Sequence, residues 1–589
     1  MARHSHPTLW GASLVSPGRT RFRLWAPIQR QPHLAIEGRE PIPMGKQDAG
    51  WFEVEVECGA GTPYRYRLDD GMLVPDPASR AQTDDVHDPS LVVDPHAYEW
   101  RNAEWKGRPL EEVVVYEAHA GLMGGFDGVR SHLKDLADLG VTAIQLMPIG
   151  AFPGARNWGY DGVLPYAPDA AYGTPEALKR LVDEAHGHGL QVFLDVVYNH
   201  FGPEGNYLHA YAEPFFRNDI HTPWGAAIDF RRREVRRFFA DNVMMWLMEY
   251  RIDGLRFDAV HQIPERDWLD EVAAEVRRTI EPGRHVHLIL ENEENDPGYL
   301  GREIDAQWND DFHHCVHVML TGEDQSYYGN YIRDTAGKLA RCLREGFVYQ
   351  GEAPENGEGG PRGGPSGHLP PTAFVTCLQN HDQVGNRAFG DRLTTLVERK
   401  ALDAATALHV LCPQIPMIFM GEETGSKEPF LFFTDYHDGL ADAVREGRRR
   451  EFKAFPEFAD PHTRERIPDP NAPATFARSR PAIGGESGDH AVHALYKRLL
   501  ALRAEHVAPR LKGAKAESAE VVNEKAVVGR WLMGDGARLT ILTNLGAIPA
   551  PLRGVAVPAG EPFLVVGQPL VADGVPAHTT LAWLEDAPK

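Results

Sequence analysis

The chain has 589 residues, and its 84 acidic side chains outnumber its 61 lysines and arginines, which gives a net charge of −23. So acidic a balance argues against a nucleic-acid partner, because binding to a phosphate backbone needs clustered basic residues. Hydrophobic residues make up 42% and charged residues 25%, ordinary globular values that exclude disordered, collagenous and coiled-coil chains.

The sequence shows no sign of a membrane or secreted protein. No apolar run approaches the ~20 residues that span a bilayer, and the first residues contain no apolar signal core. The five cysteines are scattered and form no C-x-x-C pair, which favours a reducing compartment and offers no zinc site. We therefore expect a cytoplasmic protein with no membrane partner, built from about two to four domains.

The first 95 residues predict a small immunoglobulin-like β-sandwich. Residues 20–27, 51–57 and 64–68 alternate apolar and polar side chains with the period of a strand, and clusters of Gly, Pro and Asp separate them. Residues 76–96 are rich in Asp and Pro and are expected to form a linker.

Between residues 96 and 510, short apolar strands alternate with helices. Val129, Leu133 and Leu136 share one helical face that ends at Gly140, and Thr174 is placed to cap the start of another helix. The count favours a closed (β/α)8 TIM barrel over a doubly wound sheet, and no G-x-G-x-x-G follows the first strand. The eight expected strands cover residues 113–116, 142–147, 191–197, 253–258, 287–291, 305–308, 373–378 and 414–420.

Two further regions complete the expected architecture. Residues 351–371 are rich in Gly and Pro and predict a mobile loop before the seventh strand of the barrel. After a helix around residues 492–502, strands at 526–531, 539–545 and 563–566 predict a C-terminal β-sandwich over residues 511–589.

Polar side chains gather where four of the barrel strands end. The carboxyl ends of parallel strands meet at one mouth of a barrel, so these residues are expected to share a site. The four ends read DVVYNH (195–200), RFDAVH (256–261), LENE (290–293) and QNHD (379–382). They combine carboxylates, histidines and an arginine, without a cysteine or a serine nucleophile motif.

This set of side chains suits the hydrolysis of a glycosidic bond. Asp258 and Glu291 end neighbouring strands, at an expected spacing of about 5 Å that fits the retaining mechanism. One must be ionised to attack the sugar, and Arg256, on the same strand face as Asp258, is expected to lower the pKa of Asp258. The other must carry a proton, and the charges of Asp258 and Asp382 are expected to raise the pKa of Glu291.

Other residues at the mouth have plainer interpretations. Asp195 is expected to be structural, bonding Arg256 and the backbone. Asn199 could ligate calcium or brace a loop, and bracing is the preferred interpretation. His261 and Glu293 could be rim residues without a ligand. Because four such strand ends meet at one mouth, we favour a functional site over a set of residues with structural roles only.

The four segments resemble, in order and spacing, the signature segments of the α-amylase superfamily (glycoside hydrolase family 13). The resemblance implies a nucleophile at Asp258, a general acid/base at Glu291 and a transition-state stabiliser at Asp382. The residues that match sugar contacts at the cleavage point are Arg256, His200 and His381. Residues 157–161 (NWGYD) are similar to a segment whose Tyr stacks on that sugar. The remaining substrate-binding candidates are Trp158, Tyr160, Asp161, His261, Asn292 and Glu423.

Within the superfamily, residues 421–423, 429–435 and 445–452 are most similar to the trehalohydrolase subfamily. This implies hydrolysis of the α-1,4 bond next to the terminal trehalose unit of maltooligosyltrehalose, with maltooligosaccharide as the other product and with no metal or cofactor. Residues 291–293 read Glu-Asn-Glu where the subfamily often has Glu-Asn-Asp or Glu-Ser-Asp, a departure that concerns contacts beyond the cleavage point. The alternatives are a glucan branching or debranching enzyme and a non-catalytic glycan-binding protein. The sequence predicts no oligomeric state.

Overall fold

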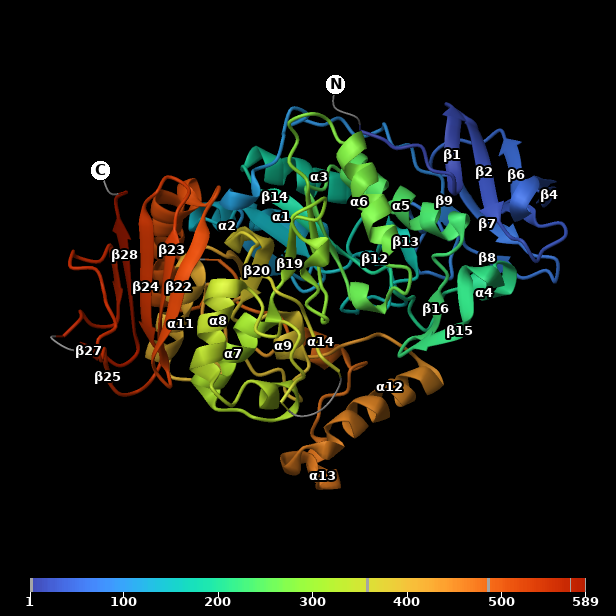
Figure 1. Ribbon diagram of the computed structural model, residues 1–589. Helices are drawn as coiled ribbons and strands as arrows, with labels where there is room; N and C mark the ends of the chain where they lie inside the picture. Colours follow the sequence, from blue (N-terminus) through green and yellow to red (C-terminus); the bar gives the residue numbers. More distant parts are fainter. Residues whose placement is uncertain (1–3, 356–359, 485–487, 572–573, 588–589) are drawn as a thin grey trace.

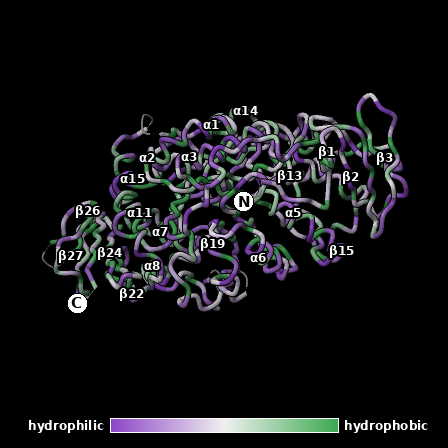
Figure 2. The backbone as a smooth tube through the Cα atoms, turned by 90° about the horizontal axis from the view of Figure 1, so that it is seen from above, coloured by the Kyte–Doolittle hydropathy of each residue, from purple (hydrophilic) through white to green (hydrophobic). Residues whose placement is uncertain are grey.

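The computed structural model describes residues 4–355, 360–484, 488–571 and 574–587, with a central barrel and a β-rich region at each end of the chain (Figure 1). A second view, from above, again places the N-terminal and C-terminal strands at opposite ends of an elongated molecule (Figure 2). No helix in the described part of the chain combines the length and the apolar character needed to cross a bilayer.

Eight parallel strands close into a barrel in chain order, which confirms the predicted (β/α)8 fold. Every residue of these strands is buried, because helices cover the outer face and apolar side chains such as Phe193, Ile289 and Met417 fill the interior. The strands are β10 (Val115–Ala118), β11 (Ala143–Leu146), β14 (Gln191–Val196), β17 (Gly254–Phe257), β18 (His287–Leu290), β19 (Ala306–Trp308), β20 (Phe374–Cys377) and β21 (Ile415–Phe419).

The helices around the barrel follow the predicted faces, with two differences. The helix expected to end at Gly140 is two short helices that meet at His132, and Gly140 closes the second with a φ of 108°. Two helices between β19 and β20, α7 (Asp310–Thr321) and α8 (Thr335–Glu345), were not predicted. The other barrel helices are α1 (Gly125–Ser131), α2 (Leu133–Leu139), α3 (Pro175–Gly187), α5 (Arg233–Met248), α6 (Asp267–Thr279), α11 (Arg399–Leu411) and α15 (His490–Leu502).

The N-terminal region consists of two antiparallel sheets packed around Phe22, Leu34 and Phe52. One contains β1 (Gly11–Ser16), β2 (Arg19–Trp25), β6 (Trp51–Val56) and β5 (Gly45–Lys46). The other contains β4 (Ile42–Pro43), β3 (His33–Ile36), β7 (Pro63–Arg67), β8 (Leu73–Val74) and β9 (Ser90–Leu91). The expected linker is only partly one: Asp76 is fully buried and accepts hydrogen bonds from the hydroxyls of Tyr64 and Tyr66 at 2.7 and 3.0 Å.

The C-terminal region is a five-stranded antiparallel sheet with a small two-stranded sheet against it. Val528, Leu542, Val575 and Leu581 form the core between the two. The large sheet contains β22 (Lys515–Asn523), β23 (Ala526–Leu532), β24 (Arg538–Asn544), β28 (Thr579–Glu585) and β26 (Leu564–Val566), and the small one contains β25 (Ala550–Pro551) and β27 (Gly574–Val575). Strands β22, β25, β27 and β28 were not predicted.

Insertions after the barrel strands surround its mouth. Two hairpins pair β12 (Gly150–Ala151) with β13 (Leu164–Pro168) and β15 (Phe216–Thr222) with β16 (Gly225–Ile228). After β21, the helices α12 (Asp438–Glu451) and α13 (Pro461–Glu465) project from the body of the molecule (Figure 1). The described part of residues 351–371 contains one isolated bridge, between Glu352 and Arg362, and no helix or strand before the turn at 371.

Candidate active site

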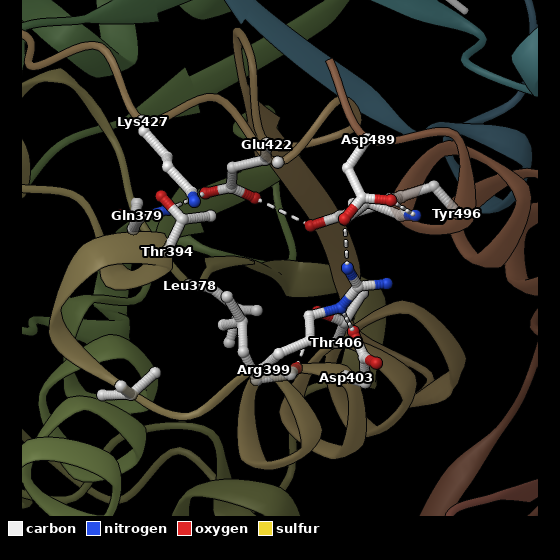
Figure 3. Close-up of a pocket in the computed structure, with 14 residues that line it drawn as sticks. Leu378, Gln379, Thr394, Arg399, Asp403, Thr406, Glu422, Lys427, Asp489 and Tyr496 are labelled. Carbon is white, nitrogen blue, oxygen red and sulfur yellow. Dashed lines mark hydrogen bonds and ion pairs between the residues drawn. The ribbon is translucent and has the colours of Figure 1, made fainter.

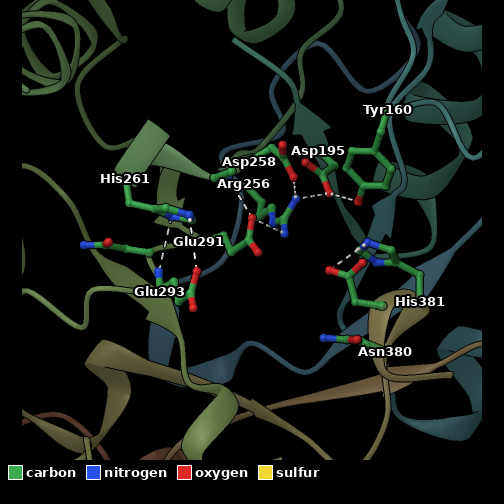
Figure 4. A network of polar contacts seen from close by, with 12 residues as sticks. Tyr160, Asp195, Arg256, Asp258, His261, Glu291, Glu293, Asn380 and His381 are labelled. Carbon is green, nitrogen blue, oxygen red and sulfur yellow. Dashed lines mark hydrogen bonds and ion pairs between the residues drawn. The ribbon is translucent and has the colours of Figure 1, made fainter. Parts of the chain in front are cut away.

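A buried arginine lies at the centre of the predicted site. Arg256 is the penultimate residue of β17 and is fully buried. Its Nη1 donates to Asp195 Oδ2 at 2.7 Å and to Asp258 Oδ1 at 2.8 Å, and its Nη2 is ion-paired with Glu291 Oε2 at 2.9 Å (Figure 4). Three strand ends that are distant in the sequence therefore meet at one guanidinium. A buried cation needs this kind of compensation, because taking a charge out of water is costly.

The barrel register places these groups side by side. Asp195 and Arg256 are paired positions on the neighbouring strands β14 and β17, and Arg256 pairs in turn with Ile289, two residues before Glu291. The guanidinium also lies over the ring of Trp308 on β19, 4.1 Å from its centroid. The ring and the three carboxylates fix the orientation of Arg256.

A second charged contact at the mouth links Glu117 on β10 to His381, which follows β20. His381 Nδ1 lies 2.7 Å from Glu117 Oε1, and the His381 backbone N–H donates to Glu117 Oε2 at 3.0 Å. His381 Nε2 lies 3.4 Å from Asp382 Oδ2. Burial opposes a charge on this imidazole, but the carboxylates of Asp382 and Glu117 outweigh burial and raise the pKa of His381 to about 9. His381 is therefore an imidazolium at neutral pH.

The charge on His381 makes part of the stability depend on pH. Its pKa is near 6.5 in the unfolded chain and about 9 in the fold, so the stabilisation is complete below about pH 6.5 and is lost as the pH rises through 9. Glu117→Gln should therefore lower Tm most at about pH 6, and its deficit relative to wild type should shrink towards about pH 9.5. Thermal unfolding followed by circular dichroism measures this deficit. A deficit that is the same at every pH would contradict it.

Tyr160 and His200 border the same space. The Tyr160 hydroxyl donates to Asp195 Oδ2 at 2.7 Å, and its ring is stacked on that of His381 with centroids 5.0 Å apart. His200 Nε2 lies 2.9 Å from the Tyr160 carbonyl oxygen, and burial lowers the pKa of His200 to about 4, so this histidine is neutral. Trp224, at the turn of the β15–β16 hairpin, stacks on His200 at 4.4 Å and is 48% exposed.

The pKa shifts of Asp258 and Glu291 differ from those expected from the sequence. Burial and the charge of Glu291 raise the pKa of Asp258 well above its usual range. Burial also disfavours the charge on Glu291, but Arg256 and the backbone N–H of Ala259, which donates to Glu291 Oε2 at 2.7 Å, lower the pKa of Glu291. The expected directions, a lowered pKa for Asp258 and a raised pKa for Glu291, were wrong, because Arg256 binds both carboxylates and not Asp258 alone.

Four of the predicted substrate-binding residues form side-chain hydrogen bonds to other residues in the loops around the mouth. Asn292 Oδ1 accepts from the Glu294 N–H at 3.1 Å, and Trp158 Nε1 donates to the Leu431 carbonyl at 2.9 Å. Asp161 accepts from Asn157 Nδ2 at 2.7 Å. Glu423 is fully buried and accepts from the Gly421 N–H at 2.9 Å.

The neighbour of Glu423 belongs to a second cavity, behind β20 and β21. Glu422 accepts from Gln379 Nε2 at 3.0 Å and from the Tyr496 hydroxyl at 3.1 Å (Figure 3). The cavity has a volume of about 200 Å³, and Arg399 and Asp489 form an ion pair of 2.8 Å at its edge.

A large open cleft begins at the catalytic candidates. Its volume is about 1020 Å³, and Glu291 and Asp382 both line it. His261 lines it too, with Nδ1 accepting from the Glu293 N–H at 3.4 Å. In the described residues, no group of three or more His, Cys, Asp or Glu side chains has the arrangement of a metal site.

Two acidic residues of the site were missed by the sequence reasoning: Asp310, which lines the cleft, and Glu117, which is fully buried. Asp310 begins α7 directly after β19, a strand whose end was not searched for polar side chains. Glu117 is the penultimate residue of β10, whose end was not searched either, and it partners His381 across 264 residues of chain. Extending the search for polar strand ends to all eight strands could have found both.

Comparison with known proteins agrees with this geometry. Residues 114–220 match the model of the α-amylase catalytic domain, and residues 514–581 match a domain of unknown function, DUF3459. The malto-oligosyltrehalose trehalohydrolase of Deinococcus radiodurans is 40% identical over 95% of this chain and 93% of its own length. That of Saccharolobus solfataricus is 40% identical over 84% of this chain and 87% of its own length.

The chain belongs to the malto-oligosyltrehalose trehalohydrolase family. As a member of this family it is a glycoside hydrolase of the α-amylase type, as the four signature segments implied. A solved structure from Salmonella typhimurium, 42% identical, superposes on 99% of this chain and 100% of its own with a TM-score of 0.92. A 1,4-alpha-glucan branching enzyme of Xanthomonas oryzae is 32% identical but over only 42% of this trehalohydrolase-family chain.

Proposed function

We propose that the chain hydrolyses the α-1,4-glucosidic bond next to the terminal trehalose unit of maltooligosyltrehalose. The products are trehalose and a shortened maltooligosaccharide. The observation that carries this proposal is the 40% identity to relatives named malto-oligosyltrehalose trehalohydrolase over nearly the whole chain. The pair of carboxylates that the retaining mechanism needs, Asp258 and Glu291, supports it, with Asp382 as a third carboxylate at the same mouth.

The proposed reaction has two steps at the anomeric carbon. Glu291 protonates the bridging oxygen while Asp258 attacks the carbon, so that trehalose leaves and a covalent β-glycosyl-enzyme forms. Glu291, now ionised, then takes a proton from water as that water attacks the same carbon, and the maltooligosaccharide leaves with its α configuration retained. Asp382 faces the positive charge that develops on the ring between these states.

The mechanism needs the proton of the Asp258–Glu291 pair to be on Glu291 when substrate is bound. The two groups are close enough to share one guanidinium, so they titrate as a pair. In the free protein the Glu291 side chain is 21% exposed and that of Asp258 is 11% exposed. A sugar unit over Glu291 removes the remaining water from it, which raises the pKa of Glu291 and moves the proton of the pair onto Glu291, ready for transfer to the leaving oxygen.

The remaining substrate-binding candidates divide into residues around the sugar that Asp258 attacks and residues in the surrounding loops and cleft wall. Tyr160, His200, Arg256 and His381 are proposed to hold this unit, since they surround the space next to Asp258. Trp158, Asp161, Asn292 and Glu423 are proposed to act through the loops that they brace, and His261 to act at the cleft wall. A cytoplasmic location remains part of the proposal.

The test is product analysis on a defined substrate. Incubation of the protein with maltotriosyltrehalose should release equimolar trehalose and maltotriose, measured by anion-exchange chromatography. Maltopentaose of the same chain length is the control and should be cut far more slowly. Formation of α-1,6 branches on amylose, with no trehalose from the first substrate, would overturn the proposal in favour of a branching enzyme.

A further inference from the structure

The cleft extends beyond Glu291, on the side away from the residues that hold the cleaved sugar. In Figure 4, Glu291 lies between the Arg256–Asp258 pair and the His261–Glu293 pair, and Tyr160 lies on the far side of Arg256. Glu291, His261 and Glu293 line the cleft. The proposed acid stands at the bond to be broken, so the part of the substrate that leaves occupies the cleft beyond it.

Two adjacent aspartates begin α7 on the floor of this cleft, and their surroundings are opposite. Asp311 is buried and is fully engaged within the protein. Its carboxylate accepts from Asn295 Nδ2 at 3.0 Å, the Val348 N–H at 2.7 Å, Arg362 Nη2 at 3.0 Å and the Tyr331 hydroxyl. Asp310 accepts a hydrogen bond from no group in the described ranges of the chain, although it lines the cleft together with Glu291 and Asp382.

The charges around Asp310 give its carboxyl group both donor and acceptor character. Burial, and then the negative charges of Glu291 and Asp382, raise the pKa of Asp310 to about 7. A carboxyl group that is partly protonated near neutral pH can donate to one hydroxyl oxygen and accept from another hydroxyl. Sugars offer both, and a carboxyl group that lines the cleft without a protein partner can form such hydrogen bonds with a ligand.

We propose that Asp310 binds a hydroxyl group of the leaving disaccharide, an α,α-1,1-linked pair of glucose units, and so contributes to recognition beyond the cleavage point. The inference rests on the proposed function, because it takes trehalose as the leaving group. It assigns different roles to two neighbouring acids: Asp311 holds the floor of the cleft together, and Asp310 contacts substrate.

The test compares two substrates that differ in whether a leaving sugar enters this part of the cleft. Maltotriosyltrehalose places trehalose there, whereas α-maltotriosyl fluoride delivers the same glycosyl unit with fluoride as the leaving group. Asp310→Asn should lower kcat/KM on maltotriosyltrehalose by about 10- to 100-fold, the loss of a hydrogen bond to a charged group. Hydrolysis of the fluoride should stay within about 2-fold of wild type, since Asp258 and Glu291 are untouched.

A third measurement addresses binding directly. Free trehalose should bind in this part of the cleft, and its dissociation constant, measured by titration calorimetry, should rise for Asp310→Asn by a factor similar to the loss in kcat/KM. Asp324→Asn removes the same charge from an exposed position beyond the other end of α7 and should change none of the three readouts. Asp310→Ala is a second variant, and fluoride hydrolysis shows that each variant is folded.

The outcomes separate the two proposals. Equal losses on both substrates, or no loss on either, would overturn the role of Asp310 in binding the leaving group. An unchanged dissociation constant for trehalose would overturn it as well. Failure of the proposed function is seen in the wild type alone, as the absence of trehalose among the products of maltotriosyltrehalose.

Discussion

Asp258→Asn should lower kcat on maltotriosyltrehalose by about 10⁴-fold or more while substrate binding survives, because the amide is isosteric but cannot attack the anomeric carbon. The amide oxygen can still accept from Arg256 Nη1, which is 2.8 Å from Asp258 Oδ1, and Asp195 and Glu291 still compensate the guanidinium. The fold should therefore be preserved. Steady-state kinetics give the loss in kcat, and titration calorimetry with maltotriosyltrehalose gives the retained affinity.

The loss should extend to α-maltotriosyl fluoride, since the first step on either substrate needs the nucleophile. Azide provides a stereochemical check with the smaller variant Asp258→Ala. An azide ion in the vacated space attacks from the nucleophile's side, fluoride leaves, and β-maltotriosyl azide is formed. Formation of the α-azide, or turnover by Asp258→Asn close to that of wild type, would show that another residue is the nucleophile.

Glu291→Gln should lower kcat on maltotriosyltrehalose by about 10²- to 10⁴-fold, the usual contribution of general acid catalysis. Trehalose is a poor leaving group without a proton, so the first step becomes slow. Fluoride leaves without such help, and the variant should therefore release about one equivalent of fluoride in a rapid burst and then turn over slowly. Stopped-flow detection of fluoride from α-maltotriosyl fluoride measures this burst.

Azide should accelerate the slow phase of Glu291→Gln, as expected if Glu291 is the general acid/base. Azide needs no general base, so it should accelerate breakdown of the glycosyl-enzyme and give the α-azide with retained configuration. This product has the opposite configuration to the one expected from Asp258→Ala. Absence of a burst, together with a β-azide product, would exchange the roles assigned to Asp258 and Glu291.

Elements with a strong local pattern were predictable from the sequence. The buried barrel strands are short apolar runs followed by polar residues, and all eight overlap their predicted ranges, with β10 two residues later than predicted. Thr174 caps α3 as expected, because its side chain accepts from the Ala177 N–H at 3.2 Å. Strand β22 was missed because its side chains are mostly polar or half-exposed and show no clean alternation.

The electrostatics of the site could not be predicted in the same way. The sequence places Arg256 two residues before Asp258, which suggested that the arginine stabilises the charge of Asp258 alone. In the structure Arg256 also pairs with Glu291 from the next strand, and the Ala259 N–H adds a donor to Glu291. A pKa depends on every charge within a few ångströms, and these neighbours come from separate strands.

The sequence by itself determined the barrel, the β-rich regions at both ends and the residues that match the signature segments, because strand periodicity and short motifs are local properties of the chain. Only the tertiary structure decided which of those residues bind the same charged group, that Asp382 and Glu117 together raise the pKa of His381, and that Asp310 faces the cleft while Asp311 is held by the protein. These facts depend on distances between residues far apart in the chain. The surplus of acidic residues that the composition first showed acts in this site through the few carboxylates that folding brings to one mouth.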